Sequence, residues 1–314
     1  MKINFKLLIC ALLLISIACC TPQDKNKAAD KKSAPARPKN FERVTPPLMI
    51  ANDHKAIAAY MVMHFWDNFN FRDTMYCHVP EISEQAFSDY IYIFDYTTTE
   101  KISEGVHKML DSASVEPLMY QYFFKLAEHY LYHPNSRLRN DEYYIPFLEH
   151  ITSLRDLPEE MKIRPKYQLA LAYKNRPGEK ANNLTYTLSN GKTGTLYEVS
   201  AKYTLLMFYN PGCKECQNAK NEIKNTPVIS DAVSAGKLKI VAVYPDENIE
   251  SWKSHLGDIP TSWINGYDLS LSVKNNELYD LKAIPTLILL DKDKKVIFKD
   301  TSVGHINEYL SKDQ

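Results

Sequence analysis

The sequence predicts two folded regions, an all-α helical domain followed by an α/β domain. Between residues 41 and 180 glycine is nearly absent, and apolar residues recur three and four positions apart, as in amphipathic helices. Between residues 181 and 314 short apolar segments alternate with helical stretches, which is typical of an α/β fold. A chain of 314 residues is long enough for two such domains.

The first region has six segments with helical periodicity, which suggests stacked antiparallel helical hairpins. They cover residues 53–71, 83–96, 99–113, 115–133, 140–153 and 157–174. No repeat of fixed period is found, so a tetratricopeptide-like solenoid is only an analogy. The region is rich in tyrosine, which serves either to pack the core and its rim or to form a surface that binds a peptide or protein.

The second region begins with a predicted hairpin and ends with another. Strands are expected at residues 184–188, 194–199, 203–209, 238–244, 286–290 and 296–299. Helices are expected from residue 213 to about 225, from about 247 to 256, and at the C-terminus. The buried strand at 203–209 followed directly by a helix creates a junction at residue 213.

Two cysteines, Cys213 and Cys216, stand at this junction with two residues between them. A thiolate at a helix N-terminus is favoured by free N–H groups and by the helix dipole, so Cys213 is the expected nucleophile. Cys216 lies one turn further along and is the expected resolving thiol, so the pair forms a redox disulfide. Lys214 and Glu215 have opposite effects on a nearby thiolate, and the direction of electron flow stays open.

A zinc site is the alternative for a pair of cysteines with this spacing. It would need a second pair of ligands, and the remaining candidates, Cys77 with His78, His255 and His305, are scattered along the sequence. We therefore expect neither a metal nor a cofactor.

The segment from 208 to 216, the tripeptide Ile284-Pro285-Thr286 and the closing hairpin with its helix resemble the thioredoxin fold, and more closely its TlpA/ResA-like branch. The resemblance covers residues 181–314. It implies a cis peptide bond before Pro285 facing the cysteines, and substrate-binding positions at Ile284, Pro285 and Gly212. A cis bond is accessible only before proline, which agrees with this, and a trans proline at the start of a strand is the alternative.

The sequence departs from this family at the groups that assist proton transfer. Met207 occupies the position of the buried acid of thioredoxin, and Ala219 that of the glutamate of the ResA-like branch, with Glu222 a turn further along. Gly212 replaces a tryptophan that often precedes the first cysteine. The assisting base therefore remains open, and we expect slow turnover or a narrow range of substrates.

The N-terminus predicts export and a lipid anchor. Residues 1–18 combine lysines with a short apolar run, as in a signal peptide, and Cys19 follows small residues as in a bacterial lipobox. Cleavage before Cys20 and an ordinary signal peptide are the alternatives. Residues 19–40 lack an apolar face and are expected to form a disordered tether.

These features predict a periplasm-facing thiol-disulfide oxidoreductase anchored to the lipid of the inner or outer membrane, which reduces periplasmic protein disulfides and receives electrons from a membrane donor. Nucleic-acid binding is not expected, because Lys and Arg total 38, equal to Asp and Glu, and no basic cluster stands out. A protein-binding scaffold with little turnover is the second hypothesis. A thiol peroxidase is the third, although Asn210 occupies the position where a hydroxyl is needed.

Overall fold

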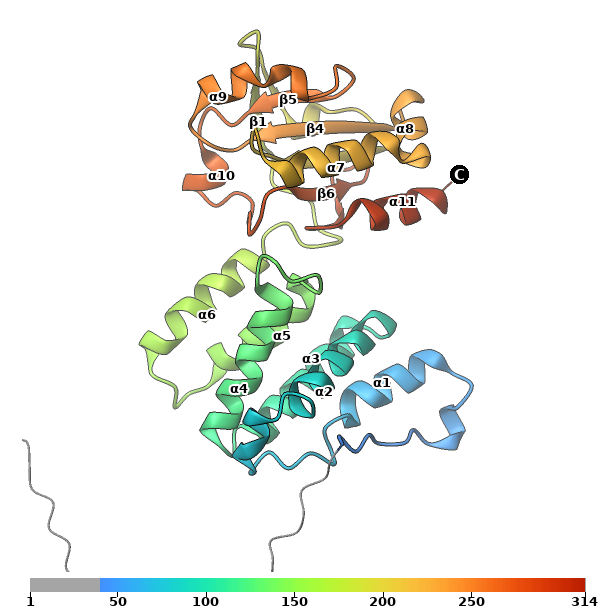
Figure 1. Ribbon diagram of the computed structural model, residues 1–314, viewed down its shortest axis with the longest axis vertical. Helices are drawn as coiled ribbons and strands as arrows, with labels where there is room; N and C mark the ends of the chain where they lie inside the picture. The colour runs from blue at the N-terminus through green and yellow to red at the C-terminus, as the bar shows by residue number, and fades with distance from the viewer. Residues whose placement is uncertain (1–39, 314) are drawn as a thin grey trace, which may run out of the picture. The chain divides into compact units, whose positions relative to one another are not determined.

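A helical region and a mixed β-sheet follow one another along the chain, as the sequence predicts (Figure 1). The computed structural model describes residues 40–313, so the expected signal peptide, Cys19 and nearly all of the expected tether lie outside the described residues. Within residues 40–313, no helix combines the length and the apolar character needed to cross a bilayer.

The helical region consists of six α-helices and several shorter helical turns. In chain order these are η1 (Leu48–Ile50), α1 (His54–His64), η2 (Thr74–His78), α2 (Ser83–Tyr92), η3 (Ile93–Tyr96), α3 (Thr99–Ala113), α4 (Pro117–Ala127), the π-helical turn η4 (Glu128–Tyr132), α5 (Asp141–Ser153) and α6 (Glu159–Ala172). All six expected α-helices are present.

Capping side chains define where these helices begin. The hydroxyl of Thr98 accepts a hydrogen bond from the Lys101 N–H at 3.4 Å at the start of α3. The Asn140 Oδ1 accepts one from the Glu142 N–H at 2.9 Å at the start of α5. Each cap satisfies an N–H that has no partner inside its helix.

The core of the helical region is aromatic, and this explains why α1 is shorter than expected. The sequence predicts a helix up to residue 71, but α1 ends at His64. Phe65, Trp66 and Phe71 are buried just beyond that end, and Trp66 packs edge-on against Phe123 of α4 with ring centroids 4.9 Å apart. A continued helix would carry some of these rings to the outer face.

The second region is a seven-stranded mixed sheet with the strand order β2-β1-β5-β4-β3-β6-β7. The strands are β1 (Thr185–Leu188), β2 (Thr193–Thr195), β3 (Tyr203–Phe208), β4 (Leu238–Tyr244), β5 (Ile264–Tyr267), β6 (Thr286–Leu290) and β7 (Val296–Phe298). β4 pairs in parallel with β3 and β5, and the other pairs are antiparallel. The helices are α7 (Lys214–Asn225), α8 (Pro227–Ser234), α9 (Ile249–Ser254), α10 (Ser272–Asn275) and α11 (Val303–Ser311), with short turns η5 (Leu196–Glu198) and η6 (Leu256–Asp258).

The central strand β3 is buried on both faces. Leu205 and Met207 belong to a core that also holds residues of α7 and α11, while Leu206 and Phe208 belong to a second core on the other face. All six residues of β3 are buried, and each large apolar side chain buried in this way contributes about 1.5–3 kcal/mol. The strand therefore gives a rigid base to the junction that follows it.

Two strand predictions for this region were incomplete or wrong. β5 was not predicted as a strand. The expected strand at 194–199 ends at Thr195, and η5 follows, because Glu198 reaches back and its carboxylate accepts a hydrogen bond from the Thr195 N–H at 2.8 Å. This is half of a capping box, so the turn is set by local chemistry.

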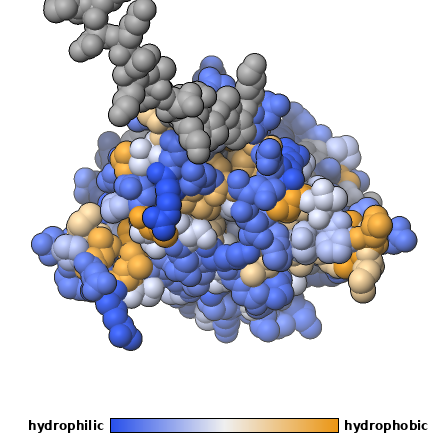
Figure 2. All heavy atoms as spheres, turned by 90° about the horizontal axis from the view of Figure 1, so that it is seen from below, coloured by the Kyte–Doolittle hydropathy of each residue, from blue (hydrophilic) through white to orange (hydrophobic). Residues whose placement is uncertain are grey.

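The tyrosines of the helical region divide between core and surface. Tyr90 and Tyr144 are fully buried, whereas Tyr92, Tyr96 and Tyr167 are exposed. The face of the molecule drawn in Figure 2 is mostly hydrophilic, and its hydrophobic residues form several separate patches. Core packing thus accounts for part of the tyrosine content, and other rings lie exposed at the surface.

Candidate redox site

The two cysteines lie where the sequence places them, at the junction of β3 and α7. Cys213 caps the helix, and its sulfur accepts a hydrogen bond from the Cys216 N–H at 3.1 Å. Gly212 before it has φ +70°, a conformation that side chains other than glycine's rarely adopt. Cys213 is half-buried, Cys216 is fully buried, and both are free thiols.

Pro285 lies beside this pair, and the Ile284–Pro285 bond is cis, as expected. The Cys213 sulfur lies 3.9 Å from the Ile284 carbonyl oxygen. The register of the sheet explains the proximity, because Thr286 at the start of β6 pairs with Phe208 at the end of β3. The structure therefore brings together Cys213, Cys216, Ile284 and Pro285, while their catalytic and substrate-binding roles remain predictions.

The surroundings of Cys216 contain a lysine and a tyrosine that the sequence analysis did not single out. Met207 is buried and Glu222 is exposed, so neither position places a carboxylate behind the cysteines. Lys220, one turn after Cys216, is buried. The Tyr209 hydroxyl, also buried, donates a hydrogen bond to Asn265 Oδ1 at 2.8 Å. The only sequence signal for Lys220 was its four-residue spacing from Cys216.

The pKa values of these groups follow from their burial. Burial, together with the hydrogen bond to Cys213, raises the pKa of the Cys216 thiol to about 12, although a backbone hydrogen bond at Asn210 and the charge of Lys220 act in the opposite direction. Burial also raises the pKa of the Tyr209 hydroxyl, which stays neutral. The Cys216 side chain is therefore a protonated thiol at neutral pH.

A groove of about 370 Å³ adjoins the site and is lined by both regions of the chain. Asn210, Pro245 and Ile284 line it from the side of the cysteines, and Tyr167 and Leu171 of α6 line it from the helical region. The helical region thus contributes a wall to the space next to Ile284.

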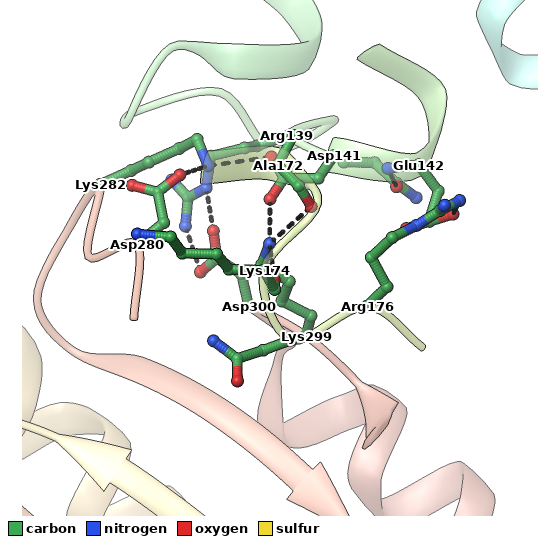
Figure 3. A network of polar contacts seen from close by, with 12 residues as sticks. Arg139, Asp141, Glu142, Ala172, Lys174, Arg176, Asp280, Lys282, Lys299 and Asp300 are labelled. Carbon is green, nitrogen blue, oxygen red and sulfur yellow. Dashed lines mark hydrogen bonds and ion pairs between the residues drawn. The ribbon is translucent and has the colours of Figure 1, made fainter. Parts of the chain in front are cut away.

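A network of ion pairs joins the helical region to the segment that precedes Pro285 (Figure 3). Asp141 lies at the start of α5. Its Oδ1 accepts a hydrogen bond from Lys282 Nζ at 2.9 Å, and its Oδ2 forms an ion pair with Lys299 Nζ at 2.7 Å. Lys282 also pairs with Asp280, and Lys299 donates to the main-chain oxygen of Lys174 at 2.7 Å.

These charges are buried and therefore strongly coupled. The side chains of Asp141, Lys282 and Lys299 are 8%, 4% and 8% exposed. Burial alone would raise the pKa of Asp141, but Lys282 and Lys299 hold that pKa below its ordinary value. Asp141 and Asp280 in turn raise the pKa of Lys282 against the effect of its burial. The ionised forms are thus mutually stabilised.

Two further ion pairs extend this network. Arg139 and Asp300 interact through two nitrogens of the guanidinium, Nε and Nη2, with Nη2 to Oδ1 at 2.7 Å. Arg176 and Glu142 form a second two-point pair, with Nε to Oε1 at 2.9 Å. Paired geometry of this kind fixes orientation as well as distance.

The remaining cysteine and the histidines do not form a metal site in the described part of the chain. Residues 40–313 contain no group of three or more His, Cys, Asp or Glu side chains placed to hold an ion. Cys77 is a half-buried free thiol whose sulfur lies 3.9 Å from Met119 Sδ, and burial raises its pKa.

Comparison with known proteins matches each of the two regions to a family model. Residues 18–175 match the model of a domain of unknown function, DUF5106, and residues 201–296 match a thioredoxin-like family. A crystal structure of a thioredoxin-like protein from Bacteroides caccae is 44% identical, with a TM-score of 0.84, over 88% of this chain and 100% of that one. The chain belongs to the thioredoxin-like proteins that carry a DUF5106 domain.

Other solved structures match a part of this chain. The C-terminal domain of an uncharacterized protein from Bacteroides fragilis is 50% identical over 44% of this chain and 98% of that one, with a TM-score of 0.43. A conserved protein of unknown function from the same species is 36% identical over 43% of this chain and 98% of that one, with a TM-score of 0.42. A search of the curated proteins finds no match.

Proposed function

We propose that this protein is a membrane-tethered thiol-disulfide oxidoreductase of the TlpA/ResA-like type that reduces disulfides of periplasmic proteins. The observation that carries the proposal is the placement of Cys213, which lies at the start of α7 and 3.9 Å from the carbonyl oxygen of Ile284, before a cis proline. Cys216 is buried behind it, where it is shielded from the client but close to Cys213.

The reaction transfers two electrons from the cysteine pair to a client. The Cys213 thiolate attacks one sulfur of a client disulfide, and the other client sulfur leaves as a thiolate. The Cys216 thiolate then attacks the Cys213 sulfur, which forms the Cys213–Cys216 disulfide and releases the second client sulfur. A membrane dithiol donor would restore the reduced pair by the reverse exchange.

The client would approach along the groove beside Ile284. Main-chain groups around Ile284 and Pro285 would hold an extended polypeptide, and Gly212 has no side chain to obstruct it. Because Tyr167 and Leu171 line the same groove, the DUF5106 region would limit which clients fit. This gives the helical region a role in selecting substrates.

The proposed location depends on the N-terminal sequence. Residues 1–18 would direct export, Cys19 would carry the lipid, and residues up to 40 would act as a tether. Loss of membrane association on Cys19→Ser in the full chain tests this part of the proposal. A variant that stays in the membrane fraction would contradict it.

Reduction of insulin by the purified protein tests the activity. With a dithiol as electron source, we expect the natural chain to reduce insulin, Cys213→Ser to be inactive, and the control Cys77→Ser to remain active. Cys216→Ser should accumulate mixed disulfides with clients, since the resolving thiol is absent.

The raised pKa of Cys216 favours a second candidate, a binding scaffold with little turnover. Equal rates of insulin reduction in the natural chain and in Cys213→Ser would support the scaffold and contradict the enzyme.

A further inference from the structure

Lys220 is a buried lysine on the helix that carries both cysteines. It lies four residues after Cys216, a spacing that places two side chains next to each other on one face of a helix. The residue is only 4% exposed. Its Nζ donates a hydrogen bond to the Asp258 main-chain oxygen at 3.2 Å and lies 5.8 Å from the centre of the Tyr209 ring.

The charge of Lys220 is incompletely compensated within the described residues. No carboxylate of residues 40–313 forms an ion pair with it, and the ammonium has three donor hydrogens for one accepting carbonyl. A buried ammonium without a counter-charge is costly, so buried lysines usually have an anionic partner. One turn before it on the same helix is a group that can become an anion, the Cys216 thiol, whose pKa the charge of Lys220 lowers.

Cys216 in turn needs a cation when it reacts. The free N–H groups at the start of α7 serve Cys213, whose sulfur accepts from the Cys216 N–H. Cys216 itself is fully buried, and burial opposes its ionisation. The other titratable groups around it are Cys213 and the neutral Tyr209, and the carboxylate of Asp258 acts on Tyr209 in turn. Among the described residues, Lys220 is the one whose positive charge lowers the pKa of Cys216.

We propose that Lys220 is a positioning residue whose ammonium stabilises the Cys216 thiolate while that thiolate resolves the mixed disulfide. The inference rests on the function proposed above. In this step the Cys216 thiolate forms a bond to the Cys213 sulfur, the bond from Cys213 to the client sulfur breaks, and the client leaves as a thiolate. The proton lost by Cys216 passes to the departing client thiolate or to solvent, and Lys220 keeps its own proton.

The role requires a positive charge, which separates it from a purely structural role. Lys220→Gln keeps a donor for the Asp258 carbonyl and removes the charge, whereas Lys220→Arg keeps the charge. Lys224→Gln removes an exposed lysine from the same helix and serves as the control. If Lys220→Gln does not fold, as judged by circular dichroism, Lys220→Met takes its place.

The test uses a mixed disulfide between Cys213 and thionitrobenzoate in the full chain. Attack by Cys216 releases the coloured thionitrobenzoate, and its rate is followed from mildly acidic to alkaline pH. A rise of one unit in the pKa of Cys216 lowers the thiolate fraction tenfold and raises its nucleophilicity about threefold, so release slows about threefold for each unit. We expect Lys220→Gln to release the probe at least about threefold more slowly at neutral pH, with its pH profile displaced to higher pH. Lys220→Arg and Lys224→Gln should match the natural chain.

The outcomes separate this inference from the proposed function. If the natural chain releases no thionitrobenzoate, the proposed function fails. If it does, and Lys220→Gln shows the same rate and the same pH profile, only the role of Lys220 is overturned. If no neutral variant at position 220 folds, the pH profile of the natural chain decides. Release of thionitrobenzoate governed by an apparent pKa below the value of about 12 that Cys216 has in the reduced pair supports the proposal, and release confined to strongly alkaline pH contradicts it.

Discussion

Asp141 is the residue at which the coupling between the two regions can be measured most directly. It is the shared partner of Lys282 and Lys299, and all three side chains are buried. Asp141→Asn keeps the size and one oxygen of the side chain but removes its charge. Two cations of the thioredoxin-like domain would then lose the carboxylate that they share.

The expected cost is about 3 kcal/mol of the free energy of unfolding. Removing one partner of a buried ion pair costs about 3–5 kcal/mol, because the other charge stays buried. The lower figure applies because Lys282 keeps Asp280 and Lys299 keeps the main-chain oxygens of Ala172 and Lys174. A loss of this size lowers Tm by about 6–12 °C in a protein of roughly 150–250 residues, and by somewhat less in a longer chain.

The effect should depend on pH in a defined direction. The folded state lowers the pKa of Asp141, so its ionisation stabilises the fold above the unfolded pKa of about 3.9. That contribution is lost as the pH falls through the lower, folded pKa. The difference in the free energy of unfolding between the natural chain and Asp141→Asn is therefore expected to have its full size at pH 7 and to shrink below about pH 4.

Urea unfolding followed by circular dichroism at several pH values is the assay. Glu250→Gln is the control, because Glu250 pairs with Lys253 at the surface, where the side chains are 83% and 54% exposed. Exposed pairs of this kind contribute about 0–1 kcal/mol. If Asp141→Asn lowers the free energy of unfolding no more than Glu250→Gln does at pH 7, the buried network does not make the expected contribution of about 3 kcal/mol.

Two further predictions concern packing and thiol reactivity. Gly105→Ala would place a Cβ 2.5 Å from both Cγ1 and the carbonyl oxygen of Val62, so we expect a loss of about 1–3 kcal/mol in urea unfolding. Gly257→Ala, which meets open space, is the control, and equal stability of the two variants would contradict the close approach of α1 and α3. Burial raises the pKa of Cys77, so iodoacetamide should modify it more slowly than free cysteine at neutral pH, as measured by peptide mass spectrometry. Modification at the rate of free cysteine would show that Cys77 is not shielded.

The sequence alone was sufficient to predict the elements that are specified by local sequence patterns. The helix at 99–113 has an N-cap at Thr98 and a regular apolar face, and α3 has those bounds. The position of Cys213 at a helix start also followed from the local pattern, and the cis bond before Pro285 followed from the resemblance to the thioredoxin fold. The fold class and the geometry of the cysteine site were accessible for this reason.

Features that depend on tertiary contacts were missed. β5 has the sequence Ile-Asn-Gly-Tyr, which resembles a turn, and it is a strand because β4 and β1 pair with it on either side. A lysine at position 220 is typical of a solvent-exposed helix face, and its burial depends on the η6 segment that supplies the Asp258 carbonyl. The ion pairs of Asp141 link positions more than a hundred residues apart, which no local pattern reports.

The ion pairs of Lys282 and Lys299 with the helical region also affect how the thioredoxin-like half could be used by itself. Cleavage or gene fusion that removes residues up to 180 would strip both cations of the Asp141 carboxylate, and one of them stands two residues before Ile284. A variant limited to the thioredoxin-like half should therefore have positions 282 and 299 neutralised first. Otherwise mutual repulsion of the two lysines would disturb the loop that precedes Pro285.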